Sequence, residues 1–120
     1  MLDLKALLTK ILNAITPTQI ASWSYTTGAA NTWVKSGNFT IPTAGIYCIR
    51  ADYNNSAVFG IGYSATSSNY IWQAIIIQEN ATAGSIETAT YFSSGTYTLW
   101  TKCQTASRSN TIYITKLLTP

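Results

Sequence analysis

The stretch that decides the fold is Gly37-Asn38-Phe39-Thr40-Ile41-Pro42-Thr43-Ala44-Gly45-Ile46-Tyr47. We interpret it as the end of one short strand, a turn at Ala44-Gly45 that requires positive φ, and the start of a longer strand over 45–53. Pro42 ends the first strand because it has no amide hydrogen to donate to a neighbour. The stretch therefore predicts successive strands joined by a tight turn.

The same pattern continues along the chain on both sides of this stretch. Short alternating or wholly apolar runs are broken about every eight to twelve residues by Gly, Asn and Ser, which is typical of a β-sandwich. Tight turns are expected at Ser36-Gly37-Asn38 and Ser93-Ser94-Gly95, and nothing after Pro17 predicts a helix. We expect strands near 20–27, 31–35, 38–42, 45–53, 57–63, 70–78, 85–92, 96–103 and 111–118.

The first 16 residues carry a different pattern. Apolar residues recur at spacings of three and four, as in the a and d positions of a coiled coil, at Met1, Leu4, Leu8, Ile11 and Ile15, and the apolar face is widened by Leu2, Leu7 and Leu12. Residues 1–16 are therefore predicted to be an amphipathic helix ended by Pro17, and residues 18–120 a single head domain. The alternative to self-association is a helix packed on its own head. We favour self-association, and Leu8 at a with Ile11 at d favours more than two strands.

Three segments resemble the tumour necrosis factor and complement globular-head superfamily. They are residues 37–47, the hairpin Tyr91-Phe92-Ser93-Ser94-Gly95-Thr96-Tyr97-Thr98-Leu99-Trp100, and the closing run 110–118. The resemblance implies an all-β jelly-roll head that forms a homotrimer, with its inner strands around the three-fold axis. Thr96 departs from the family pattern, which commonly has Asp after the hairpin Gly.

Heads of this type resemble the trimeric tips of bacteriophage tail fibres and spore-surface filament proteins. A short leucine-rich helix directly before the head is similar to the arrangement in phage and prophage receptor-binding proteins. The resemblance implies a receptor-binding or tail-tip head on a virion or extracellular particle, anchored to a larger fibre through the helix and recognising a cell-surface saccharide or protein. The alternative is a purely structural trimer in a capsid, tail or spore surface.

The composition argues against catalysis. The chain has no His, which excludes Ser-His-Asp and Cys-His catalysis. Of the four carboxylates, Glu79 and Glu87 form the one conceivable acid/base pair, and two exposed hairpin carboxylates are the simpler interpretation. We expect no enzyme activity and no cofactor, although a trimer could gather three copies of Asp52 around a metal on its axis.

Charge and cysteine content narrow the partners further. The seven basic residues are scattered, so no nucleic-acid surface is predicted. Asp3 and the polar residues within the first 16 make a poor secretion signal, and that segment is too short to insert across a membrane. Cys48 and Cys103 are interpreted as free thiols, with a disulfide as the alternative. Since 47% of residues are hydrophobic and 9% charged, we expect apolar surface hidden in an oligomer.

Aromatic residues supply most of the candidate binding positions, because aromatic rings both fill cores and stack on sugars. The candidate ligand-binding residues lie near strand ends or loops and are Trp23, Trp33, Tyr63, Tyr70 and Trp72, with Asn54, Asn69 and Arg108 as polar helpers; Asn55 and Asn110 are further candidates. The candidate trimer-interface residues are Leu4, Leu8, Ile11 and Ile15 in the helix and Tyr47, Tyr53, Tyr97 and Tyr113 in the strands. Because alternation points many of the strand positions inward, these tyrosines are assigned either to core packing or to the trimer axis.

Overall fold

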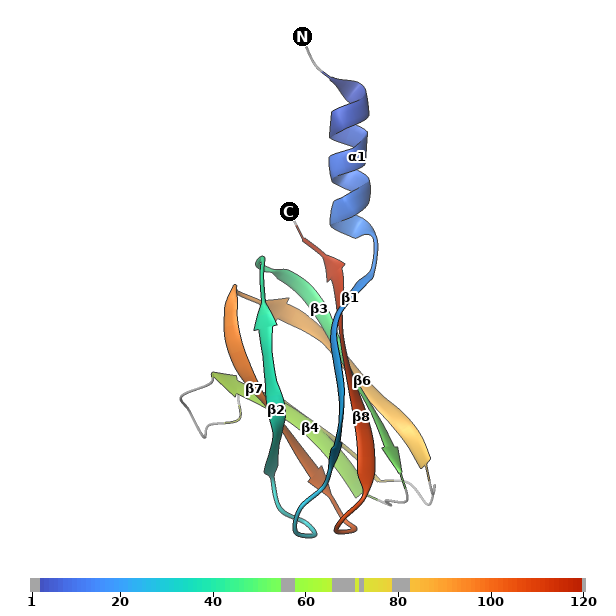
Figure 1. Cartoon of the computed structure of the whole chain (residues 1–120), viewed down its shortest axis with the longest axis vertical. Helices are drawn as coiled ribbons and strands as arrows, with labels where there is room; N and C mark the ends of the chain where they lie inside the picture. The colour runs from blue at the N-terminus through green and yellow to red at the C-terminus, as the bar shows by residue number, and fades with distance from the viewer. Residues whose placement is uncertain (1–2, 55–57, 66–70, 72, 79–82, 120) are drawn as a thin grey trace.

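The computed structural model describes residues 3–54, 58–65, 71, 73–78 and 83–119. A helix stands on one end of a two-layer β-sandwich and extends beyond it along the long axis of the molecule (Figure 1). The elements are α1 (Leu4–Ile15), β1 (Thr18–Thr26), β2 (Val34–Ile41), β3 (Gly45–Asn54), β4 (Val58–Ala65), β5 (Gln73–Gln78), β6 (Ala83–Phe92), β7 (Gly95–Cys103) and β8 (Ser109–Leu118). In this order the helix comes first and all of the described strands follow it.

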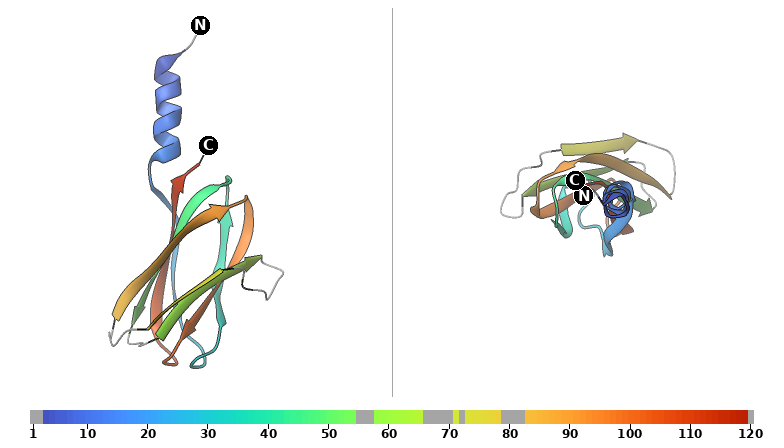
Figure 2. Two further views of the ribbon diagram at one scale, coloured as in Figure 1. Left: turned by 180° about the vertical axis from the view of Figure 1, so that it is seen from behind. Right: turned by 90° about the horizontal axis from the view of Figure 1, so that it is seen from above.

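The strands form two antiparallel sheets that face one another (Figure 2). One sheet has the order β1-β8-β3-β6 and the other β2-β7-β4-β5. The pairs β1-β8, β8-β3 and β3-β6 of the first sheet correspond to β2-β7, β7-β4 and β4-β5 of the second. This is the connectivity of a jelly roll built from two Greek keys. The expected all-β sandwich is confirmed.

The prediction of separate strands at 31–35 and 38–42 is wrong, because one strand, β2, runs from Val34 to Ile41. Its register against β7 shifts between Lys35 and Gly37, so a bulge stands where a turn was expected. The Trp23 indole fills this bulge and donates a hydrogen bond from Nε1 to the Ser36 carbonyl at 3.1 Å. A Cβ on Gly37 would lie 2.9 Å from that Nε1, so the close approach requires glycine.

The turn before β3 also differs from expectation. Gly45 does not have positive φ. A Cβ at this position would collide with the Leu118 carbonyl, so glycine is needed because β3 and the end of β8 approach so closely.

The core lies between the sheets and is aromatic at the end nearest α1. Phe92 is its centre, with ring centroids 4.7 Å from Tyr63, 5.0 Å from Tyr97 and 5.7 Å from Phe39. Two buried tyrosines satisfy their hydroxyls with backbone carbonyls: Tyr47 donates to Thr43 at 2.6 Å and Tyr97 to Ser93 at 2.9 Å. Aliphatic side chains from both sheets complete the core: Ile41, Ile49, Ile61, Ile86, Leu99, Ile112 and Ile114.

The helix is closed at both ends by local hydrogen bonds. The Asp3 carboxylate accepts from the Ala6 amide at 3.1 Å as an N-cap, and the Thr16 amide donates to the Leu12 carbonyl at 2.9 Å. The helix ends at Ile15, as Pro17 predicts. No helix among the described residues is long and apolar enough to cross a membrane.

Candidate functional site

The apolar side of α1 is exposed to solvent along its whole length. We name the helix stripe the six residues Leu4, Leu7, Leu8, Ile11, Leu12 and Ile15, whose exposed fractions range from 41% to 63%. The helix is joined to the head through its other side, where the Thr119 amide donates to the Ala14 carbonyl at 2.9 Å and the Lys116 ammonium donates to the Asn13 carbonyl. The expected alternative, a helix packed on its own head, is therefore not the arrangement of this structure.

Three of the tyrosines predicted at a trimer axis lie inside a single chain. Tyr47, Tyr53 and Tyr97 are buried between the two sheets, with exposed fractions of 1%, 3% and 6%. Odd-numbered positions of β3 point inward, so the alternation that places Ile49 in the core places Tyr47 and Tyr53 there too. Of the two roles expected for them, core packing is the one they have; a place at the trimer axis is wrong, since they have almost no surface to offer.

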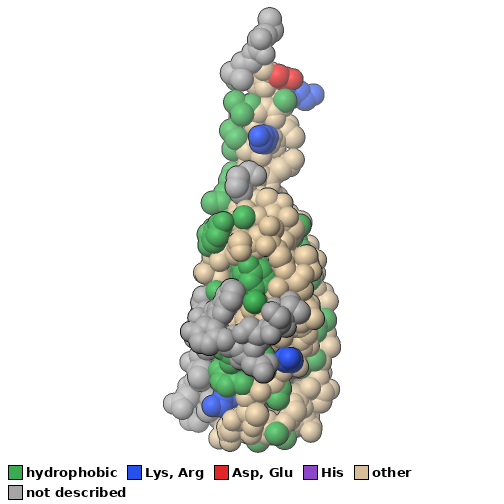
Figure 3. Space-filling view, turned by 90° about the vertical axis from the view of Figure 1, so that its left-hand side faces the viewer, with side chains coloured by type: hydrophobic (Ala, Val, Ile, Leu, Met, Phe, Trp, Pro, Cys, Tyr) green, Lys and Arg blue, Asp and Glu red, His purple; other side chains and the backbone are tan. Residues whose placement is uncertain are grey.

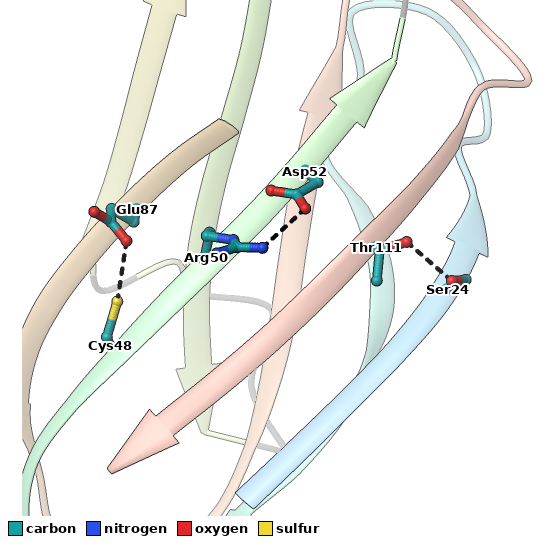
Figure 4. Close-up of polar contacts among 6 residues, drawn as sticks. All are labelled: Ser24, Cys48, Arg50, Asp52, Glu87 and Thr111. Carbon is teal, nitrogen blue, oxygen red and sulfur yellow. Dashed lines mark hydrogen bonds and ion pairs between the residues drawn. The ribbon is translucent and has the colours of Figure 1, made fainter. Parts of the chain in front are cut away.

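Tyr113, the fourth, lies on the outer face of the β1-β8-β3-β6 sheet. The Arg50 guanidinium stands over its ring, 4.4 Å from the centroid, and forms an ion pair with Asp52 at 3.1 Å. On the same strand as Arg50, the Cys48 thiol donates to the Glu87 carboxylate of β6 at 3.6 Å (Figure 4). We name Cys48, Arg50, Asp52, Glu87 and Tyr113 the polar cluster. Its members come from the neighbouring strands β6, β3 and β8, and they lie close together because Arg50 is directly opposite both Glu87 and Tyr113 in the sheet.

Every residue of the polar cluster except Asp52 borders a shallow hollow of about 290 Å³, which is lined also by Gln19, Thr115 and Leu117. The hydrogen bond from Arg50 to Asp52 raises the pKa of the guanidinium, which stays charged. Burial raises the pKa of the Cys48 thiol, and the nearby Glu87 carboxylate raises it further. The thiol is therefore a poor nucleophile near neutral pH, and the cluster is suited to hydrogen bonding.

One atom of the polar cluster has a hydrogen-bonding capacity that the described chain does not use. Oδ1 of Asp52 is shielded from solvent and has no hydrogen-bond partner among the described residues. Among the described residues, no group of three His, Cys, Asp or Glu side chains could hold a metal ion.

The pole opposite α1 carries two loops that are joined to one another. We name residues 27–33 and 104–108 the distal pole (Figure 1). The Thr27 amide donates to the Arg108 carbonyl at 2.8 Å, and the Arg108 amide donates to the Thr27 hydroxyl at 2.7 Å. The Asn31 amide donates to the Cys103 carbonyl at 2.8 Å. These bonds join the two loops to one another and to the end of β7.

The distal pole contains two of the predicted ligand-binding residues. Trp33 and Arg108 are both half-buried there, so each keeps part of its side chain at the surface. Asn110, the further candidate, is fully buried at the start of β8 and does not reach a ligand.

Two other candidates are used by the fold. Tyr63 is buried against Phe92, so its prediction as a ligand-binding residue is wrong. Trp23 is half-buried over the β2 bulge, and its indole nitrogen already donates to Ser36. Both sit in β-strands whose alternation points them toward the opposite sheet.

Of the remaining predicted positions, only the backbone of Asn54 is described. Asn54 is the last residue of β3. The following lie outside the described residues: Asn55, Asn69, Tyr70, Trp72 and, from the proposed carboxylate pair, Glu79.

The polar cluster was not predicted as a site, although the sequence held a signal for it. In β3, Cys48, Arg50 and Asp52 alternate with buried residues, and alternating polar positions share one face of a strand. Glu87 and Tyr113 could be added only with the strand order known. Cys48 and Cys103 are both free, as expected, and they lie on different sheets.

No protein-family model and no curated protein matches the chain. Solved structures do resemble it in fold. A carbohydrate-binding module from Cellvibrio mixtus lichenase 5A, in complex with cellotriose, has a TM-score of 0.50 at 18% identity, over 84% of this chain and 96% of that one. The pre-peptidase C-terminal domain of a Bacillus anthracis collagenase has a TM-score of 0.56 at 11% identity, over 78% and 87%. PirA has a TM-score of 0.50 at 12% identity, over 78% and 92%.

Proposed function

We propose that this chain is the homotrimeric, non-catalytic binding head of a larger particle, a phage or prophage-like tail tip or fibre. The helix joins three copies and anchors them to the particle. The distal pole faces outward and recognises a cell-surface saccharide or protein. The place of action is accordingly the surface of a virion or extracellular particle.

The observation that carries this proposal is the exposed helix stripe. A 12-residue helix is marginal alone in water, because isolated helices need about 12–15 residues or more even in favourable sequences. Six large apolar side chains on one side of such a helix add a further cost while they face water. Association of several helices through this stripe removes both costs, and its heptad spacing fits a coiled coil.

The distal pole supports recognition by its position and its order. It lies at the end of the molecule farthest from the proposed anchor (Figure 1), and its loops are cross-connected by backbone hydrogen bonds. Trp33 offers an apolar ring and Arg108 a hydrogen-bond donor. Binding sites for saccharides and for proteins both combine aromatic rings with a few polar groups of this kind. A module of the same fold holds cellotriose, which supports the saccharide version.

The trimer is tested by light scattering on the full chain. We expect three times the chain mass of 13.1 kDa at micromolar concentrations. The double variant Leu8→Ser, Ile11→Ser should give a folded monomer, because no residue of α1 is buried in the head. The control Thr9→Ala, Lys10→Ala changes the opposite side of the helix and should remain trimeric. A monomeric wild-type chain at all concentrations would overturn the trimer.

The recognition step is tested on a glycan array and on whole bacterial cells with a verified trimer. We expect binding to a restricted set of glycans or cells, reduced at least tenfold by Trp33→Ala at the distal pole. The control Thr43→Ala changes an exposed turn at the helix end of the head and should bind normally. Signals equal to blank on both surfaces would contradict recognition.

A second candidate, a purely structural trimer, is favoured by one observation. Trp23 and Tyr63, two of the rings expected to stack on sugar, are committed to the fold. A structural trimer has the same mass but gives blank signals in both binding assays, so the two experiments together separate the candidates.

A further inference from the structure

A second apolar surface lies on the head directly below α1. Among the described residues, the large hydrophobic side chains that are exposed are the six of the helix stripe and two more, Tyr91 at 61% and Leu118 at 47%. Ile46 is half-buried between them. In the sheet, Ile46 is directly opposite Tyr91 on one side and Leu118 on the other, so the three form one row across β6, β3 and β8. We name this row the apolar shelf.

The shelf is a hollow surface and is almost free of polar atoms. Its residues, with Gly45 and Thr119, line a hollow of about 330 Å³. Gly45 lets β3 approach the Leu118 carbonyl closely and so forms part of the floor. Figure 3 shows hydrophobic side chains along one edge of the helix and again on the top of the head below that edge. The helix stripe and the shelf therefore face the same side of the molecule.

The helix stripe alone is too small to hold a stable oligomer. A helix of 12 residues is about 18 Å long and about 10 Å wide, so half of its side surface is about 280 Å². A stable, specific interface buries about 800 Å² on each partner. The heads must therefore contribute contact area, and the apolar surface next to the stripe is the part of the described head that gains most from leaving water.

We infer that the apolar shelf is the head's share of the self-association surface, and that its occupant is the neighbouring copy of this chain. The inference rests on the proposed homotrimer and adds to it the surface through which neighbouring heads contact one another. When helices associate side by side through their stripes, each shelf comes to lie beside the neighbouring head, because stripe and shelf share one side. Tyr91 and Leu118 then pack across the interface while the distal pole stays open.

The test is the concentration dependence of the full-chain mass by light scattering or sedimentation. We expect Tyr91→Ser and Leu118→Ser each to raise the midpoint concentration of dissociation at least tenfold, and the double variant at least a hundredfold. Both side chains are largely exposed in one chain, so circular dichroism of the dissociated variants should match the wild type. The matched control is Ser85→Ala, an exposed position at the other end of β6, which should dissociate like the wild type.

The outcomes separate this inference from the proposal beneath it. A wild-type trimer whose double shelf variant dissociates at the wild-type midpoint overturns the shelf contact and leaves a trimer held by the helices alone. A wild-type chain that is monomeric at every concentration overturns the trimer and the shelf contact together.

Discussion

Tyr25 shows how strongly the sandwich controls a single polar group. Its ring enters the core from β1, and burial raises the pKa of its hydroxyl to about 12. The nearby polar side chains of Thr101 and Asn110 act in the opposite direction, and their effect on this pKa does not outweigh the burial. The folded chain therefore keeps this phenol protonated at a pH where an unfolded chain would ionise it.

This difference in the pKa of Tyr25 between the folded and unfolded chain predicts that stability falls at alkaline pH because of this one residue. In the unfolded chain Tyr25 ionises near its ordinary pKa of about 10, so between about pH 10 and 12 the unfolded state binds fewer protons and is favoured as pH rises. The stabilisation is complete below pH 10. We expect the free energy of unfolding of the wild type, minus that of Tyr25→Phe, to shrink across this window by up to about 1.4 kcal/mol per pH unit. Urea titrations from pH 8 to 11.5 measure it, and a constant difference would contradict the raised pKa.

Gly37 gives the second prediction at the residue scale. In Gly37→Ala the new methyl would lie 2.9 Å from the Trp23 indole nitrogen, so the ring must move and lose its bond to Ser36. We expect a loss of about 1–3 kcal/mol, the usual cost of overpacking, in chemical denaturation. In a Trp23→Phe background the contacting indole atoms are absent, so the same change should cost clearly less. Equal costs in both backgrounds would show that the contact is not the cause.

Residue roles could be predicted well from the sequence only for residue types that serve a single purpose in such a fold. Aromatic residues have two, and alternation tells which positions share a face without telling which face is inside. Tyr63 was therefore placed at a binding surface, and Tyr47 and Tyr97 were left between the core and the trimer axis, whereas the fold uses all three in the core. The polar cluster was missed because its members become neighbours only through the order β6-β3-β8.

At the scale of elements, the cap of α1 links local structure to assembly. Asp3 closes the helix through its bond to the Ala6 amide, and losing such a cap costs about 1 kcal/mol for each helix. Because three helices form together in the proposed trimer, we expect Asp3→Ala to lower its stability by about 3 kcal/mol. Asp3→Asn keeps an N-capping side chain and is the control. Thermal unfolding followed at 222 nm and by light scattering measures the loss, and unchanged trimer dissociation in Asp3→Ala would mean that the helices do not associate.

The elements themselves were predicted closely, and the main error has a physical cause. Gly and Asn near position 37 are typical of a turn, so β2 was predicted as two strands. The structure keeps one strand because Trp23, distant in sequence, fills a bulge there. The contact with Trp23 of β1 outweighs the local preference of Gly and Asn for a turn. That contact cannot be predicted from residues 31–42 alone, because Trp23 lies outside them.

At the scale of the whole molecule, the two ends of the chain's long axis have different chemistry. The helix end carries the exposed apolar residues of the stripe and the shelf, whereas the distal pole carries polar loops with Trp33 and Arg108. In the proposed trimer, association through the helix end leaves three copies of the distal pole side by side and pointing the same way. Three equivalent sites on one rigid body can engage a repetitive surface together, even when each site binds weakly.

This geometry predicts that avidity depends on the helix while single-site affinity does not. The monomeric double variant Leu8→Ser, Ile11→Ser keeps its distal pole intact, so its binding to a soluble monovalent ligand identified on the array should equal that of the wild type. On a surface coated densely with the same ligand, we expect the variant to bind at least about 100-fold more weakly, because linked sites gain avidity by about 10²–10⁴. Biosensor measurements at high and low coating density compare the two, and diluting the coating should remove the advantage of the trimer. A variant that matches the trimer on the dense surface would show that the three poles do not act together, and the helix would then be an anchor without a role in recognition.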